Sequence, residues 1–360
     1  MMSSHTRSCS MTIKRALWPR LAMSTLTALV ALTALAMQTA QAQTPAPVPA
    51  SAPAADFPKK PITLVVGFTP GGISDVLARA LAVKLTSQMG QTVIVDNKPG
   101  AGTLIAGEFV AKAAPDGYTL WLQDMSTHAV NVGLYKKIPY DSIKDFTPIT
   151  LVASTPLILV VNPSLQVNNL ADFAKAAKAK KGGLAYASSG NGTIPHLTTE
   201  SFNSLLGIES VHVPYKGSSA ATQAVLSGEV AYNFSTMPPA LVQVRAGKLI
   251  ALGVTTARRV AAASDVPTIA EGASAGLPGL AGFEFVLFSG ILGPKGIPPA
   301  IVAKINAEFV KAVNSPEMKQ VYTTIGADPV TNSPTEFLAH MTAETAKYVK
   351  AVNASGIKID

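Results

Sequence analysis

The segment Ile62–Arg79 constrains the fold more than any other part of the sequence. Its apolar run Ile62–Phe68 predicts a buried strand. Residues 70–72, Pro-Gly-Gly, predict a tight turn, and a helix is expected to begin near Ser74 or Asp75. Because glycine has no Cβ, the backbone amides of this turn can approach a ligand closely. The helix start adds unpaired N–H donors and the positive end of its dipole, so the segment predicts a seat for a carboxylate or another anion.

The same order of strand, loop and helix recurs along the chain. Four further strands are expected before such loops: Thr92–Val95, Tyr118–Gln123, Leu184–Ala187 and Val211–Val213. The third of these five units is expected to continue as a loop over 124–128 and a helix over 129–135. Strands that alternate with helices predict an α/β fold with parallel sheets covered on both faces. Ligands of such folds bind beyond the carboxyl ends of the strands, so a binding cleft is expected at these loops rather than a catalytic centre.

Two apolar strands, Pro156–Val161 and Phe283–Leu292, do not belong to a simple strand–helix unit. We interpret them as paired crossover strands that join two lobes. The first lobe is then discontinuous, over residues 57–157 and 283–360, and the second covers 158–282. The length of the chain agrees with two domains.

Residues 1–42 are interpreted as a secretory signal peptide, because basic residues without acids precede the apolar run Leu21–Met37. Cleavage is predicted after Ala42, with export to the periplasm. An uncleaved membrane anchor is the alternative, but the run is short for a bilayer span. Residues 43–56 are rich in Pro and Ala and predict a tether. Cys9, the single cysteine, lies in the leader, so the mature chain depends on its core rather than on disulfides.

The net charge of +8 is raised by the leader. Four of the 29 basic residues lie in it, which leaves 25 against 21 acidic residues, a net charge of +4 for the mature chain. This balance indicates neither a nucleic-acid partner nor a strong attraction to membranes.

A second candidate anion seat is the polar loop Ser188–Thr193, which precedes a helix with Pro195 near its start. Its hydroxyls and glycine amides could surround a carboxylate without a charged side chain. The alternative is an ordinary polar turn with a Ser or Thr cap. Lys216 could supply a positive charge from the second lobe, or could be a solvated loop lysine.

Other chemistries have less support. No Gly-x-Ser-x-Gly elbow surrounds Ser188 or Ser189, and nothing in the spacing requires His128, His196 or His212 to meet them as a base. Histidines at metal-binding spacing are missing from the sequence, so no metal is expected. The loop Gly100–Ala106 comes nearest to a nucleotide fingerprint but lacks the third glycine in register, so no cofactor is expected either.

At this point the motifs resemble those of a known family, the Bug-type periplasmic receptors of tripartite tricarboxylate transporters. The matching segments cover nearly all of the mature chain, and their joint order and spacing are specific although each is short. They are Phe57–Ile62, Gly71–Arg79, Val95–Gly102, Ala114–Leu120, Tyr186–Thr193 and Val213–Gly217.

The resemblance implies a two-lobed type II periplasmic-binding fold, the Venus flytrap, which closes around a small carboxylated ligand. It implies transport through a membrane permease and no enzymatic activity. The ligand-binding residues carried over by position are Phe68, Pro70, Gly71, Gly72, Asp75, Thr127, His128, Ser188, Asn191, Gly192, Thr193 and Lys216.

Three departures from the family pattern affect the expected pocket. Residues 67–72 read Gly-Phe-Thr-Pro-Gly-Gly where relatives often have Pro-Phe-Pro-Ala-Gly-Gly, and Phe234–Met237 replaces a usual Asp-Asn. Asp124 and Met125 replace small or hydroxyl residues before the Thr-His pair. An acid at Asp124 would repel a second carboxylate if it faced the cleft, unless a cationic group or another partner met it.

We therefore expect a monomeric exported receptor that traps a small organic acid by hinge closure. One alternative is a ligand-binding protein that presents its closed form to a membrane sensor kinase. A secreted hydrolase that uses Ser189 or His128 is the weakest alternative.

Overall fold

The computed structural model describes residues 56–355. The predicted signal peptide, its cleavage site and tether residues 43–55 lie outside the described residues. No helix within 56–355 combines the length and apolar character that a membrane crossing requires.

Two groups of strands share one long strand, β4 (Phe146–Val161). In the first group, β1 (Ile62–Val66) lies between β2 (Val93–Asn97) and β3 (Thr119–Asp124), parallel to both. β9 (Val286–Pro294) then runs antiparallel between β3 and β4, and the short β10 (Asp328–Pro329) pairs with β4. We call this group and its helices the first lobe.

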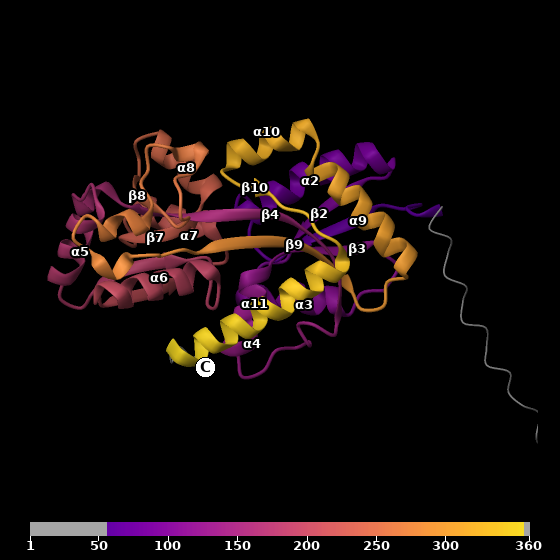
Figure 1. Ribbon diagram of the computed structural model, residues 1–360, viewed down its shortest axis with the longest axis horizontal. Helices are drawn as coiled ribbons and strands as arrows, with labels where there is room; N and C mark the ends of the chain where they lie inside the picture. The colour runs from indigo at the N-terminus through magenta and orange to yellow at the C-terminus, as the bar shows by residue number, and fades with distance from the viewer. Residues whose placement is uncertain (1–55, 356–360) are drawn as a thin grey trace, which may run out of the picture. The chain divides into compact units, whose positions relative to one another are not determined.

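The second group begins where β4 passes on to new partners at Leu157. β4 pairs antiparallel with β7 (Tyr232–Thr236) and with β8 (Ile250–Val254). β5 (Leu184–Ser188) then lies parallel to β7 and to β6 (Ser210–Pro214). We call this group and its helices the second lobe (Figure 1).

Helices connect these strands. Those of the first lobe are α2 (Ile73–Met89), α3 (Leu104–Ala111), α4 (Met125–Leu134), α9 (Pro299–Val313) and α10 (Pro316–Ile325), with a 3-10 turn η2 (Ala101–Thr103) before α3. Those of the second are α5 (Leu170–Ala179), α6 (Ile194–Leu206), α7 (Ser218–Ser227) and α8 (Met237–Arg245). The last helix, α11 (Pro334–Ser355), packs along α4 and β4.

Two crossover strands are present as predicted, but of the predicted strand Pro156–Val161 only Pro156 pairs with β9, and its other residues pair with β7 and β8. β4 and β9 are antiparallel from Phe146 opposite Pro294 to Pro156 opposite Val286 (Figure 1). β4 is much longer than the predicted strand, and the prediction of parallel sheets holds only outside these two strands. The predicted lobe boundary at 157/158 falls where β4 changes partners, but the boundaries themselves stay a prediction.

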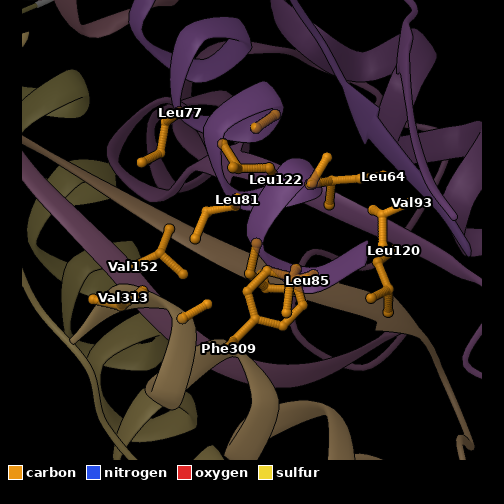
Figure 2. Close-up of a cluster of buried hydrophobic side chains, with 14 of the residues drawn as sticks. Leu64, Leu77, Leu81, Leu85, Val93, Leu120, Leu122, Val152, Phe309 and Val313 are labelled. Carbon is orange, nitrogen blue, oxygen red and sulfur yellow. The ribbon is translucent and has the colours of Figure 1, made fainter. Parts of the chain in front are cut away.

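The first lobe is held by one apolar cluster under α2. Leu77, Leu81 and Leu85 recur every four residues, so they share one face of the helix, and that face meets Leu122 of β3 and Phe309 of α9 (Figure 2). Each such fully buried side chain contributes roughly 1.5–3 kcal/mol by leaving water. α2 ends at a left-handed glycine, Gly90, whose N–H bonds to Thr86 O. The helix that begins at the predicted anion seat is therefore firmly anchored.

A second apolar cluster lies in the second lobe around Phe173, Tyr186 and Phe202. It also includes Tyr348 and Val352 from α11, while Phe337 and Met341 of the same helix pack in a first-lobe cluster with Trp121 and Phe146. The C-terminal helix therefore contacts the cores of both lobes.

Candidate functional site

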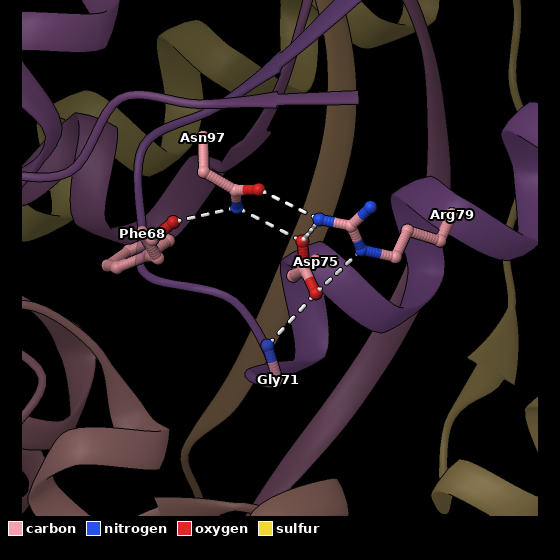
Figure 3. Close-up of polar contacts among 5 residues, drawn as sticks. All are labelled: Phe68, Gly71, Asp75, Arg79 and Asn97. Carbon is pink, nitrogen blue, oxygen red and sulfur yellow. Dashed lines mark hydrogen bonds and ion pairs between the residues drawn. The ribbon is translucent and has the colours of Figure 1, made fainter. Parts of the chain in front are cut away.

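The loop between β1 and α2 is held from beneath by Asp75, which is 3% exposed. Asp75 Oδ2 accepts hydrogen bonds from Gly71 N (2.9 Å) and Arg79 Nε (3.1 Å). Its Oδ1 accepts from Asn97 Nδ2 (3.0 Å) and pairs with Arg79 Nη2 (2.8 Å). Asn97 Nδ2 also donates to Phe68 O (2.9 Å), so the end of β2 is tied into the same network (Figure 3).

This network determines the charge of Asp75. Burial acts to raise the pKa of Asp75, but the hydrogen bonds from Arg79, Gly71 N and Asn97 outweigh it, and the pKa lies below its usual value. Both carboxylate oxygens are engaged with protein groups. Asp75 is therefore placed to shape the loop, and its predicted contact with ligand would need these bonds to rearrange.

The two lobes meet at this loop. Thr69 N donates a hydrogen bond to Lys216 O across the cleft (3.1 Å). Gly71 has φ +87°, and a Cβ there would lie 2.8 Å from Ser219 Oγ. A Cβ on Gly217 would collide with Thr69. The structure is therefore closed, and glycines make the close approach possible.

The Ser188–Thr193 loop is braced by its own side chains. Thr193 Oγ1 donates to Gly190 O (2.8 Å), and Ser189 Oγ donates to Thr193 Oγ1 (3.1 Å). Ser188 Oγ lies 2.6 Å from His212 Nε2 and accepts from Gly190 N (3.1 Å). Pro195 stands in the first turn of α6, as predicted.

Two stacked histidines lie behind this loop. The rings of His196 and His212 are 4.0 Å apart between centroids, with an interplanar angle of 10°. His196 Nδ1 accepts from Gly192 N (3.3 Å), a bond that requires the neutral ring. Burial lowers the pKa of both rings, and for His212 burial and the neighbouring His196 lower the pKa to about 3.

The start of α4 differs from the sequence prediction. Residues 125–128, predicted as a loop, form the first turn of α4, because Asp124 caps the helix. Asp124 Oδ1 accepts from Ser126 N (3.0 Å), and Oδ2 accepts from the Thr127 hydroxyl. Thr127 Oγ1 also accepts from Ile194 N of the second lobe (3.3 Å).

His128 points away from the cleft. It is 1% exposed and its Nε2 lies 2.8 Å from Ser142 O. Its ring packs among Trp121, Tyr140 and Phe146. Burial lowers the pKa of His128 to about 4. The geometry therefore favours a packing role over the predicted ligand contact, and the hydrogen bond of His128 goes to Ser142 O rather than to Ser189.

A cavity of about 180 Å³, which we call the outer cavity, opens between the lobes. It is bordered by loops that follow β1, β2, β5 and β6 and by the end of α4. Its lining residues are Gly67, Phe68, Gly100, Ala101, Gly102, Thr103, Tyr135, Ser189, Gly190, Asn191, Pro214, Tyr215 and Lys216. This lining includes one cation, Lys216, and no acid.

A second, much smaller cavity of about 20 Å³ lies deeper, and we call it the inner cavity. The starts of α2, α4, α6, α7 and α8 all reach it. Its lining residues are Phe68, Gly72, Ile73, Ser74, Asp124, Ser189, Pro195, Ser218, Thr236 and Leu287. Phe68 and Ser189 border both cavities.

Four of the twelve predicted site residues line these cavities: Phe68, Gly72, Asn191 and Lys216. Gly71, Asp75, Thr127, Ser188, Gly192 and Thr193 belong to the loops and helix starts around them. The expectation that ligands bind at the carboxyl ends of the strands thus agrees with where the cavities lie.

The sequence reading missed several lining residues. Ser74 and Ser189 lie within the two loops predicted to bind an anion, so they could have been predicted as neighbours of the chosen residues. Thr236 was noted only as part of a departure from the family pattern, although it occupies the N-cap position of α8. Tyr135 and Leu287 carry no local signal, because tertiary packing alone brings them to the cavities. Among residues 56–355, no group of three or more His, Cys, Asp or Glu side chains could hold a metal ion.

The fold and the site together define a class: two-lobed binding proteins that enclose a solute at the starts of several helices. Residues 77–357 match the tripartite tricarboxylate transporter family receptor, TctC. The protein BugT of Bordetella pertussis is 35% identical over 317 residues, which cover 87% of this chain and 95% of BugT.

Solved structures show the same likeness. An R. palustris protein determined with adipate shares 35% identity and a TM-score of 0.80, covering 84% of this chain and all of that chain. MatC from Rhodopseudomonas palustris, with bound malate, shares 31% identity and a TM-score of 0.75, covering 82% and 100%.

The chain belongs to the tripartite tricarboxylate transporter receptor family, of the Bug type. The resemblance stated from the sequence motifs is confirmed, as is the two-lobed periplasmic-binding fold. Members of this family are exported to the periplasm and bind a solute for a membrane transporter; they are receptors and not enzymes.

Proposed function

We propose that this receptor captures a small carboxylated metabolite between its lobes and delivers it to the membrane permease of its transporter. The observation that carries the proposal is the convergence of five helix starts on the inner cavity. The positive ends of these helix dipoles, with the backbone N–H groups of the first turns of α2 and α7, favour an anion at the loops beside this cavity.

The closed lobes strengthen this interaction. Contacts such as Thr69 N to Lys216 O hold the lobes together around the cavities, and electrostatic attraction grows as the local dielectric falls. Lys216 adds a positive charge at the outer cavity, whose lining carries no acid. The adipate and malate found with two relatives are both carboxylates, which supports the same class of ligand here.

The predicted site residues divide into two roles in this proposal. Phe68, Gly72, Asn191 and Lys216 contact the ligand, because they line the cavities. The other loop residues hold the amides in place: Pro70, Gly71, Asp75, Thr127, Ser188, Gly192 and Thr193. His128 supports α4 from its aromatic cluster.

We further propose that cleavage after Ala42 releases a monomeric mature protein. Intact mass and light scattering of the periplasmic protein test both parts. Presentation of the closed form to a sensor kinase stays a prediction from the sequence. It requires that cells without the permease still respond to the ligand.

The proposed ligand class is tested by calorimetry and thermal shift on the mature protein. The panel consists of mono- and dicarboxylates of three to eight carbons, each paired with its neutral primary amide. At a ligand concentration of 100 Kd, binding stabilises the folded state by about 2.7 kcal/mol, a readily measured shift in Tm. At least one acid should bind while its amide does not. If no acid in the panel binds, the proposed function fails.

A further inference from the structure

Asp124 is a buried acid at the ligand cavity without a cationic partner. It is 1% exposed and lines the inner cavity. Among the described residues, its hydrogen bonds come from Ser126 N and from the hydroxyl and backbone of Thr127, all in its own helix. No Lys, Arg or His within residues 56–355 forms an ion pair with it. A carboxylate has about four acceptor positions, so these bonds do not use all of them.

Thr236 provides a second, independent indication of a missing polar partner. It is 4% exposed, lines the same cavity, and its Oγ1 has no hydrogen-bond partner among the described residues. Buried polar groups are nearly always hydrogen-bonded, and an unpaired one costs free energy. Both groups are therefore arranged for a polar ligand group that enters the inner cavity.

The chemistry of that group follows from Asp124. A bare carboxylate next to Asp124 would be repelled, whereas a hydrogen-bond donor would be attracted. Burial, with a smaller effect from Glu344, raises the pKa of Asp124 to about 6, against the lowering effect of its bonds to Thr127 and Ser126. At neutral pH the side chain is therefore mostly an acceptor.

The size and place of the cavity limit the donor further. About 20 Å³ suffices for one group of the size of a water molecule, so an ammonium or hydroxyl fits and a guanidinium does not. The rest of the ligand must extend into the outer cavity, past Phe68 and Ser189, which border both. Because the Ser189 loop and Asp124 border the same small space, the donor and the carboxylate must be close together on the ligand.

We propose that Asp124 accepts a hydrogen bond from an ammonium or hydroxyl group next to the ligand carboxylate, so that this receptor prefers 2-amino or 2-hydroxy acids to the corresponding plain acids. The proposal rests on the proposed function, since it assumes that a carboxylate binds at the adjoining loops. Asp124 is then a specificity-determining residue.

The test uses matched sets of ligands on the mature protein, with calorimetry as the readout. Each set holds a plain acid, its 2-hydroxy form and its 2-amino form: propionate, lactate and alanine; succinate, malate and aspartate; adipate, 2-hydroxyadipate and 2-aminoadipate. In at least one set, a donor-bearing member should bind at least about 10-fold more tightly than the plain acid. Which donor wins distinguishes an ammonium from a hydroxyl.

The decisive variant is Asp124→Asn, because Asn is as good a helix cap as Asp but carries no charge. It should weaken the preferred donor-bearing acid at least about 10-fold and leave the plain acid unchanged or tighter. Asp172→Asn makes the same change at the exposed start of α5, away from both cavities, and should alter none of the affinities. Asp124→Ser, which also keeps a capping oxygen, serves as a second variant if Asp124→Asn lowers Tm.

Two results overturn the inference. Either the wild type shows no preference within any set, or Asp124→Asn weakens all members of a set equally, as a purely structural cap would. If carboxylates bind but the preference is missing, only this inference fails. If no acid in any set binds, the proposed function fails with it.

Discussion

Asp75 shows how one side chain can fix the geometry of a binding loop without contacting the ligand itself. Its carboxylate joins Gly71, Arg79 and Asn97, which come from the loop, the helix and the end of β2. The loop amides are thereby fixed before any ligand arrives, which reduces the ordering cost of binding.

Asp75→Ala should therefore weaken both folding and binding. The loss leaves Gly71 N and Asn97 without their acceptor, and we expect the free energy of unfolding to fall by about 2 kcal/mol, since Arg79 is half exposed and its share is reduced by solvent. Carboxylate affinity should fall at least about 10-fold. Urea denaturation and calorimetry measure the two effects. Glu317→Ala, which removes a surface pair with Lys84, is the control and should change neither; equal behaviour of the two variants would refute the role of Asp75.

Gly72 offers a sharper test of where the ligand lies. Its φ of −78° and ψ of 173° suit any residue, and a Cβ there would meet no atom within 4 Å. Gly72→Val should therefore fold with only about 1 kcal/mol lost from the poorer cap, yet its side chain would fill the inner cavity and weaken binding at least about 100-fold. Gly71→Val, at φ +87° against Ser219, should instead lose stability as well. Thermal melts and calorimetry separate the two; wild-type affinity in Gly72→Val would place the ligand elsewhere.

At the residue scale, the sequence predicted the glycine loop but not the hydrogen bonds that hold it in place. Pro-Gly-Gly before a helix is a local pattern, so Gly72 could be predicted. The bond from Asn97 to Asp75 joins residues 22 positions apart, and no local pattern reports it.

At the scale of elements, the β5–α6 loop depends on histidines that must stay neutral. His196 Nδ1 accepts from Gly192 N, and His212 lies against Ser188. The His212 ring also stacks on Tyr186, and Glu200 lies close enough to His196 to favour its charged form. Protonating either ring would place a charge beside its neighbour and disturb the loop.

We predict that this pair makes the protein less stable in acid. The pKa of His212 is lowered in the folded state, so the unfolded chain binds the proton first and stability is lost as pH falls from about 6.5 towards the folded value of about 3. Between pH 6.5 and 4.5, the wild type should lose about 1–2 kcal/mol more than His212→Gln, which does not titrate. Urea denaturation across this range measures the difference, which should vanish above pH 7.5. Parallel curves for the two proteins would contradict the prediction.

Helices and strands could be predicted where the local sequence pattern alone determines the secondary structure. β1, β2, β3, β5 and β6 lie close to their predicted ranges, because each is a short apolar run before a polar loop. β4 begins ten residues before the predicted strand, since its first part mixes Thr147, Pro148 and Ser154 with apolar residues and gains its order from pairing with β9. The first turn of α4 was read as a loop because its capping residue, Asp124, stands among polar residues.

At the scale of the whole molecule, binding and closure should be measurable as one event. Thr69 meets Lys216, and a Cβ on Gly102 would lie 2.7 Å from Asn191 O. Because these contacts join the lobes, a bound ligand should favour the closed form and lower the radius of gyration in small-angle X-ray scattering.

Gly102→Ala should obstruct this closure. The new methyl group would push against Asn191, so we expect ligand affinity to fall at least about 10-fold and the ligand-induced change in radius of gyration to shrink. Gly90→Ala is a matched control, since Gly90 has a similar φ of +66° but no atom within 4 Å of an added Cβ. Both variants carry comparable backbone strain, and only the first meets the other lobe. Equal affinities in the two would show that this contact does not limit closure.

The class of fold and the crossover of two strands could be predicted from the whole sequence, because alternating strands and helices and two unusually apolar strands leave few alternatives. The antiparallel placement of β9 between β3 and β4 could not. It joins segments more than a hundred residues apart, and the sequence of each strand does not indicate which other strand it pairs with.

The hydrogen bond that joins the lobes at Thr69 and Lys216 is made by main-chain atoms alone. A side-chain substitution at Lys216 leaves its carbonyl in place. Mutations that change the side chains lining the pocket therefore need not break this hydrogen bond between the lobes. The ligand specificity of such a receptor can therefore change during evolution while the backbone contact that closes the lobes is kept.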